Sequence, residues 1–324
     1  MDRFQRFRSL MLREWMQHRS GWLVLMGLPA AAMLLLSLFD GHGVQLTVNG
    51  DDRSVGSIND LPAALQTIGW SVATMAVTFV LAALAVLAQL PGLARRDVQD
   101  RSIEFWRSLP TSHLQSVGAL VLMHLLVLPG LALMAAFVAG QVVALVAMLV
   151  HQGPLVWLAQ PWWSLLPALL SVAARALFGL LLAVAWLSPV LLLTMAASAW
   201  LKRWALPVVV VVTLLGLYWL DPRLPRPLVK PALDRIGQEA GDALLAIQAF
   251  KGASFDSPAD LANALPQLPA LLLRDAAHLL GSAASPAFIA ALAVAALGFT
   301  CWCCAANAPI DRPLLAPYSP PIHP

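Results

Sequence analysis

Charged residues are scarce in this chain of 324 residues: Asp, Glu, Lys and Arg make up 11% of it, whereas 60% is hydrophobic. A soluble domain carries roughly a quarter charged residues. A globular core of this length cannot hide so much apolar surface from water. The composition therefore predicts an integral membrane protein.

Nucleotide-binding and hydrolytic motifs are also missing. The sequence has no G-x-x-x-x-G-K-[ST] loop to cradle nucleotide phosphates, no H-E-x-x-H zinc motif and no G-x-S-x-G nucleophile elbow. Cys301, Cys303 and Cys304 lie too close together for a disulfide and lack the spacing of a zinc site. We therefore expect a chain that is not an enzyme by itself, with no catalytic residues and no bound cofactor or metal.

Long apolar runs are what the sequence does contain. A helix needs about 20 apolar residues to cross roughly 30 Å of hydrocarbon, and lipid offers exposed backbone groups no partners. We predict an all-α integral membrane protein with six transmembrane helices, near residues 21–39, 66–92, 117–141, 176–199, 204–220 and 286–306. The fifth is short, and the third lies in a run, 117–150, that we predict to be one kinked or tilted helix.

Basic residues orient these spans. Arginines or lysines gather before the first span, between the second and third, and between the fourth and fifth, whereas the 40–65 loop is acidic. The positive-inside rule then places both termini in the cytoplasm. The basic residues are Arg3, Arg6, Arg8, Arg13, Arg19, Arg95, Arg96, Arg101, Arg107, Lys202 and Arg203.

The first twenty residues, here called the leader, precede the first span. Phe4, Phe7, Met11 and Trp15 recur at intervals of three and four, with arginines on other faces. This pattern favours an amphipathic helix lying in the membrane interface. The alternative is a basic tail without such a role.

Residues 221–285 lie outside the membrane in this topology, on the side opposite the termini. Four prolines open the segment, and Leu233, Ile236, Ala240, Leu244 and Ile247 then share one helical face. The run Ser257-Pro258-Ala259-Asp260 carries the cap signals of a helix start. We predict a small extracytoplasmic helical element that gates the outer mouth, binds substrate or caps the assembly. After the last span, 307–324 is expected to be an irregular cytoplasmic tail.

A charged island, residues 94–116, separates the second and third spans. If 97–109 is helical, apolar side chains share one face and charged side chains the other. Such an element lies against the membrane and presents a polar ridge to a cytosolic partner, or it is an ordinary solvated loop. The candidate docking residues are Asp97, Asp100, Arg101, Glu104, Phe105, Trp106, Arg107 and Leu109.

Three polar residues lie in or beside the predicted spans. His124 and Gln141 fall in the third span, where polar groups line a pathway or form hydrogen bonds between helices. Arg175 stands just before the fourth, where it extends its charge to the interface or binds an anionic substrate. These three are the candidate pathway residues. Trp157, Trp162 and Trp163 are expected at the membrane interface.

Two short segments carry a family resemblance. Asp100-Arg101-Ser102-Ile103-Glu104-Phe105-Trp106-Arg107-Ser108-Leu109-Pro110 resembles the cytoplasmic signature of bacterial ABC-2-type transporter permeases, and Leu12-Arg13-Glu14-Trp15-Met16-Gln17-His18-Arg19-Ser20 resembles the segment before their first span. The resemblance implies a coupling helix at 97–109 and an elbow helix near 3–19. In the elbow helix the residues concerned are Phe7, Arg13, Glu14, Trp15 and Arg19. The sequence departs from the family pattern at Glu104, because the pattern has an apolar residue at this position.

The resemblance also implies a function. It predicts the transmembrane subunit of an ATP-driven exporter in a bacterial inner membrane, with two permease copies and two copies of a separate cytosolic ABC ATPase that binds ATP and Mg²⁺. Small and apolar residues in the spans suit an amphiphilic drug, peptide or lipid as cargo. The alternative is a non-transporting membrane scaffold or assembly subunit that recruits a cytosolic partner through the same island.

Overall fold

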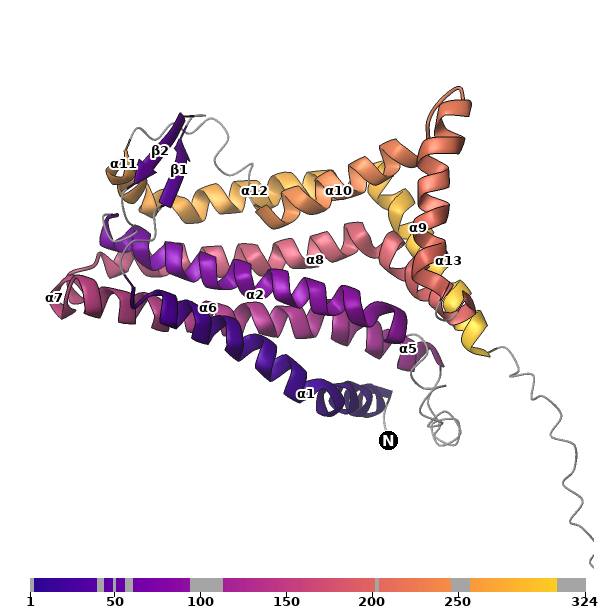
Figure 1. Cartoon of the computed structure of the whole chain (residues 1–324), viewed down its shortest axis with the longest axis horizontal. Coiled ribbons are helices and arrows are strands. Elements are labelled where there is room, and N and C mark those ends of the chain that lie inside the picture. The colour runs from indigo at the N-terminus through magenta and orange to yellow at the C-terminus, as the bar shows by residue number, and fades with distance from the viewer. Residues whose placement is uncertain are drawn as a thin grey trace, which may run out of the picture.

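The computed structural model describes residues 3–39, 44–48, 51–55, 61–93, 113–201, 204–245 and 257–307. Its framework is a bundle of long helices that run side by side, α1 (Arg3–Leu36), α2 (Ala63–Leu93), α6 (Leu128–His151) and α8 (Trp162–Leu201) (Figure 1). Helix α5 (His113–Leu122) and a π-helical turn, η2 (Met123–Val127), lead directly into α6.

Shorter elements complete the described chain. They are β1 (Val44–Val48), β2 (Asp51–Val55), α7 (Pro154–Leu158), α9 (Ala205–Leu215), η4 (Gly216–Leu220), η5 (Asp221–Arg223), α10 (Val229–Leu245), α11 (Pro258–Asn263), η7 (Leu265–Gln267), α12 (Leu268–Ala283) and α13 (Pro286–Asn307).

Within the described residues, four helical stretches are long and apolar enough to cross a membrane: Phe7–Leu36, Ala63–Leu90, Gln115–His151 and Trp162–Ser198. A fifth arises if Leu265–Ala283 and Pro286–Cys301, which meet at a bend of 67°, are counted as one broken span. The prediction of an all-helical membrane protein is thus confirmed in its coarse form. The six-span layout is not, because α9 and η4 together are not among these stretches.

The predicted third span is part of one uninterrupted helical stretch, as expected, but a longer one. The π-helical turn η2 ends at Val127, two residues before Pro129. Proline has no N–H for the carbonyl four residues earlier, and its ring crowds that carbonyl. A widened turn accommodates both problems without ending the helix.

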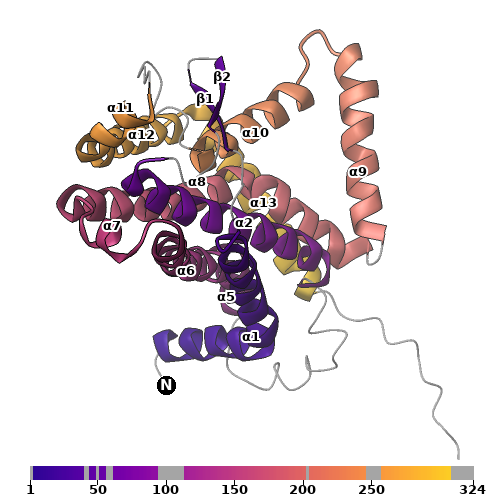
Figure 2. The ribbon, with the colours of Figure 1, turned by 60° about the vertical axis from the view of Figure 1, so that its left-hand side comes forward.

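The helix that contains the predicted fourth span starts well before residue 176. Helix α8 begins at Trp162 and has 40 residues, so it is about 60 Å long, roughly twice the hydrocarbon thickness. Arg175 therefore lies inside a continuous helix and not just before its start. The leader is likewise not a separate element, because α1 runs from Arg3 through the first span. Figure 2 shows the beginning of α1 turned away from the rest of the helix.

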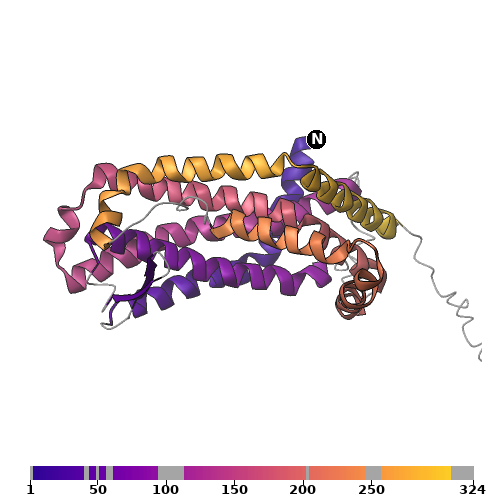
Figure 3. The ribbon, with the colours of Figure 1, turned by 90° about the horizontal axis from the view of Figure 1, so that it is seen from above.

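The described residues of the region 221–285, which are 221–245 and 257–285, are mostly helical, as predicted, and they lie along the bundle. Helices α10, α12 and α13 all pack against α8, and α12 and α8 run side by side when seen from above (Figure 3). The predicted helix start at Ser257 is confirmed, since the Ser257 hydroxyl accepts a hydrogen bond from the Asp260 N–H at 3.2 Å. Ile236, Ala240 and Leu244 share the packed face of α10, as the periodicity predicted.

A β-hairpin is the element that the all-α prediction lacked. Strands β1 and β2 are antiparallel, with Val44 opposite Val55 and Val48 opposite Asp51. In the sequence Asn49-Gly50 stands between them, and this pair favours a two-residue hairpin turn.

The bundle has two distinct ends (Figure 1). One, here called the leader end, carries the beginnings of α1 and α5 and the end of α13. The other, the hairpin end, carries β1, β2, α7 and α11. Among the described residues, the largest apolar core joins α1, α2, α5, η2, α6, α8 and α13, and it includes Trp22, Leu128 and Met195.

Candidate functional site

Polar side chains are buried at three levels of the bundle, and each level contains one of the candidate pathway residues. Gln141 belongs to α6 and contacts α2. Arg175 belongs to α8 and contacts α10 and α12. His124 belongs to η2 and contacts α1. All three make contacts within the chain.

The first level is a polar stripe on α2. Thr67, Ser71, Thr74 and Thr78 are fully buried on one face of the helix, since spacings of three and four bring side chains together. The Ser71 hydroxyl donates to the Thr67 carbonyl at 2.7 Å and receives the Gln141 Nε2 hydrogen bond at 2.6 Å. Gln141 therefore forms the hydrogen bond between helices that was one of its two predicted roles.

A close helix contact accompanies that bond. A Cβ atom at Gly140 would lie 2.7 Å from the Ser71 Cα atom, so only glycine allows this approach. Ala136 and Ala144, four residues to either side, are also fully buried. Small residues at this spacing let helices pack closely in a membrane.

The second level is an ion pair in the interior. Arg175 is 5% exposed and Asp275 is 2% exposed, and the Arg175 Nε lies 2.5 Å from the Asp275 Oδ2. Arg175 Nη1 also donates to the Ala243 carbonyl at 2.6 Å. That carbonyl belongs to the last turn of α10, where unpaired carbonyls and the helix dipole favour a cation.

Arg175 consequently joins three helices. The predicted extension of its side chain to the membrane interface is wrong, because the guanidinium is enclosed by protein. Gly179 makes room for it, since a Cβ atom there would overlap the Ala243 carbonyl oxygen. Asp275, absent from the predicted site, was detectable only as an acidic residue within the apolar run of α12.

The third level lies where the leader meets η2. Glu14 is 2% exposed and His124 is 1% exposed, and both lie beside the half-buried His18. The His18 and His124 rings meet edge to face at 4.9 Å. Arg13 donates to Glu14 Oε1 through Nε at 3.0 Å. Sequence reasoning assigned Glu14 to the elbow and His124 to the pathway, and the structure brings the two together.

The remaining elbow residues follow the leader helix. Trp15 and Met11 pack on the largest apolar core, Phe7 is half-buried and Arg19 is exposed. Leu10 of the leader is buried as well, so this part of α1 packs against the protein; its predicted position in the membrane interface stays a prediction. The predicted docking residues between Asp97 and Leu109 lie outside the described residues.

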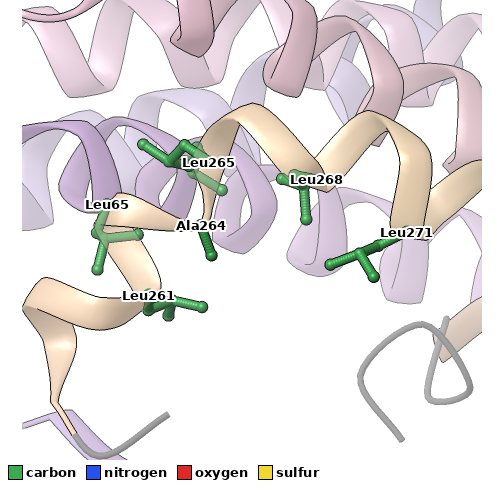
Figure 4. Close-up of a pocket in the computed structure, with 7 residues that line it drawn as sticks. Leu65, Leu261, Ala264, Leu265, Leu268 and Leu271 are labelled. Atoms are coloured by element: carbon green, nitrogen blue, oxygen red, sulfur yellow. The ribbon is translucent and has the colours of Figure 1, made fainter. Parts of the chain in front are cut away.

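An apolar pocket of about 110 Å³ opens toward the hairpin end. Leu65 of α2 lies opposite Leu261 of α11, Leu265 of η7 and Leu268 of α12, and Ile68, Ala264 and Leu271 complete the lining (Figure 4). None of these side chains is polar, so the pocket offers only apolar contact. Trp163, nearby in α8, is 96% exposed.

Comparison with known proteins does not assign the chain to a family. No protein-family model, no curated protein and no solved structure matches the chain.

Proposed function

We propose that the chain is the transmembrane permease subunit of an ATP-driven exporter of the ABC-2 type. One observation carries the proposal beyond the sequence resemblance. The leader packs on α5 and η2, and α5 is the helix that follows the charged island in the chain. Leu120, Met123 and Leu125 meet Met11 and Trp15 in the same apolar core.

This contact suggests how a movement of the cytosolic partner is transmitted to the membrane-spanning helices. A partner that moves the island shifts the beginning of α5 directly. Because packed interiors transmit displacement rather than absorb it, the leader and the π-helical turn move with it. The proposed coupling helix at 97–109 and the elbow helix then act as one unit. ATP and Mg²⁺ belong to the partner ATPase, whose binding loop this sequence does not contain.

The proposed complex has two permease copies and two ATPase copies in a bacterial inner membrane. Both described chain ends lie at the leader end of the bundle (Figure 1), which supports placing both termini in the cytoplasm. In the six-span version of the proposal, α9 and η4 cross the membrane as the fifth span. An amphiphilic cargo is supported by the apolar pocket and by the leucines and valines exposed along the bundle.

Purification from the native membrane in mild detergent tests the proposal. We expect an ATPase subunit at equal abundance by quantitative mass spectrometry. A chain recovered alone, or with a different stoichiometric partner, would contradict the transporter and favour the scaffold.

The docking role is tested on the same complex. The double variant Phe105→Ala/Trp106→Ala should insert in the membrane normally but retain less than a tenth of the ATPase subunit. The matched control is Phe39→Ala/Trp163→Ala, which removes two exposed aromatic side chains outside the island. Equal ATPase recovery and ATP hydrolysis in the island variant and the control would refute docking through the island.

A further inference from the structure

Glu14, His18 and His124 form a cluster of metal-ligand type inside the protein. Their candidate ligand atoms, a carboxylate oxygen and two imidazole nitrogens, all lie within 4.8 Å of one another. Glu14 and His18 are four residues apart and therefore share a face of α1, whereas His124 comes from η2. The sequence alone did not predict a metal site, because the third residue is more than a hundred positions away.

The Glu14 carboxylate is incompletely satisfied by the protein. Arg13 binds Oε1, but Oε2 is buried and has no hydrogen-bond partner among the described residues. An ionised oxygen withdrawn from water without a partner is strongly disfavoured. A carboxylate oxygen of Glu14 lies in the same cluster as the two imidazoles, so a cation bound by this carboxylate would compensate the buried charge.

His124 is oriented as a ligand would be. Its Nδ1 lies 3.1 Å from the Leu120 carbonyl, and a proton on Nδ1 donates to that carbonyl. The lone pair then resides on Nε2. Histidines that bind metals commonly donate their other N–H to a backbone carbonyl in this way. His124 also stands in a π-helical turn, a distortion that is frequent at functional sites.

We propose that Glu14, His18 and His124 bind a divalent transition-metal ion, with Zn²⁺ as the best match. Two imidazoles and one carboxylate form a donor set used by zinc, which leaves a fourth position for water. Ligand atoms around a tetrahedral zinc stand roughly 3.3–3.5 Å apart. The ligand atoms here lie within 4.8 Å of one another, so the three side chains would move closer together on binding the ion. A hard ion such as Ca²⁺ is disfavoured because it prefers oxygen ligands.

A metal here would tie the leader to the π-helical turn. Glu14 and His18 belong to the leader part of α1, and His124 belongs to η2, which continues into α6. The ion would therefore hold the leader against the bundle and stiffen this junction. The inference does not require that the chain transport anything, so it is tested without an ATPase partner.

The experiment uses the full-length protein, purified in detergent through a tag that contains no histidine. The protein is stripped with a chelator, titrated with Zn²⁺ and analysed for metal content after gel filtration. Cobalt(II) then serves as a spectroscopic probe, because tetrahedral coordination gives intense visible absorption. We expect about one Zn²⁺ per chain and a thermal unfolding midpoint that rises with Zn²⁺.

Matched variants locate the ion. Glu14→Gln, His18→Asn and His124→Gln should each weaken Zn²⁺ binding at least tenfold and remove the cobalt absorption. The control His278→Gln removes an exposed histidine of α12 and should bind as the wild type does. His18 is the least buried of the three, so its variant tests the site even if the other two fail to fold. Absence of stoichiometric Zn²⁺ in the wild type, or undiminished binding by His18→Asn, would overturn the proposal.

Discussion

At the scale of single residues, Arg175 shows how one contact changes the interpretation of a whole segment. A charge within an apolar run is costly in a membrane, so the sequence suggested that the span starts after it. The structure satisfies the guanidinium with Asp275, one hundred positions away, and with the end of α10. The helix can therefore continue through Arg175.

Removing one member of this pair should be severe. Asp275→Asn leaves a buried guanidinium without its counterion, which costs about 3–5 kcal/mol. We expect a large fall in the thermal unfolding midpoint in detergent. The control Glu239→Gln breaks a more exposed pair with Arg235, whose atoms lie 4.0 Å apart, and should cost less than about 0.5 kcal/mol. The double variant Arg175→Met/Asp275→Leu should regain most of the lost stability; equal stability of Asp275→Asn and wild type would contradict the assignment.

Replacing glycine with alanine should lower the stability of the folded protein at one position and raise it at another. Gly140→Ala forces a methyl group against the Ser71 backbone and should destabilise the protein by about 1–3 kcal/mol. A Cβ atom at Gly118 meets nothing within 4 Å, so Gly118→Ala should stabilise its helix by about 0.5–1 kcal/mol. Unfolding midpoints of both variants check this. A neutral Gly140→Ala would mean that α2 and α6 do not approach so closely.

At the scale of elements, helix α10 depends on a carboxylate outside it. Asp221 accepts hydrogen bonds from the backbone N–H groups of Leu228, Val229 and Lys230, at 3.0, 2.9 and 2.6 Å. These groups begin the helix and have no partner within it. Burial acts to raise the pKa of Asp221, but the three N–H donors outweigh it and hold the pKa below its ordinary value of 3.8.

This lowered pKa sets a pH dependence. Because the ionised form is favoured in the folded protein, its stabilising effect is present above the ordinary pKa and is lost as the pH falls below about 3.8. Amides 228–230 should therefore be protected from hydrogen exchange at pH 6, after correction for intrinsic rates, and lose protection at low pH. Asp221→Ala should remove protection at both values, whereas Asp234→Asn, on an exposed part of α10, should not. Protection that persists in Asp221→Ala would contradict the cap.

Element prediction succeeded where the signal is local. The Ser257 cap, the apolar face of α10 and the continuous third helix all follow from spacing within one or two turns. The hairpin was missed although Asn49-Gly50 is a local turn signal, because the surrounding loop was interpreted only by its charge. The start of α8 was missed because the continuity of the helix through Arg175 depends on Asp275, which belongs to another helix.

At the scale of the whole molecule, the two ends of the bundle should face opposite sides of the membrane. We replace the native cysteines with serine and introduce single cysteines at exposed positions, Gln17→Cys in the leader and Leu158→Cys at the hairpin end. A membrane-impermeant maleimide should label Leu158→Cys in intact spheroplasts and Gln17→Cys only after permeabilisation. The reverse pattern would invert the topology. Labelling of both cysteines in intact spheroplasts would place both ends of the bundle on the same side of the membrane and contradict the prediction.

The membrane class and the apolar helices are determined by the sequence alone. Each follows from composition or from periodicity over a few turns, because hydrocarbon thickness and helix geometry act on consecutive residues. The tertiary structure decided which polar groups meet: Arg175 with Asp275, Gln141 with Ser71, and Glu14 with His18 and His124. Two of these encounters join residues 70 and 100 positions apart, and the packing of separate helices brings them together.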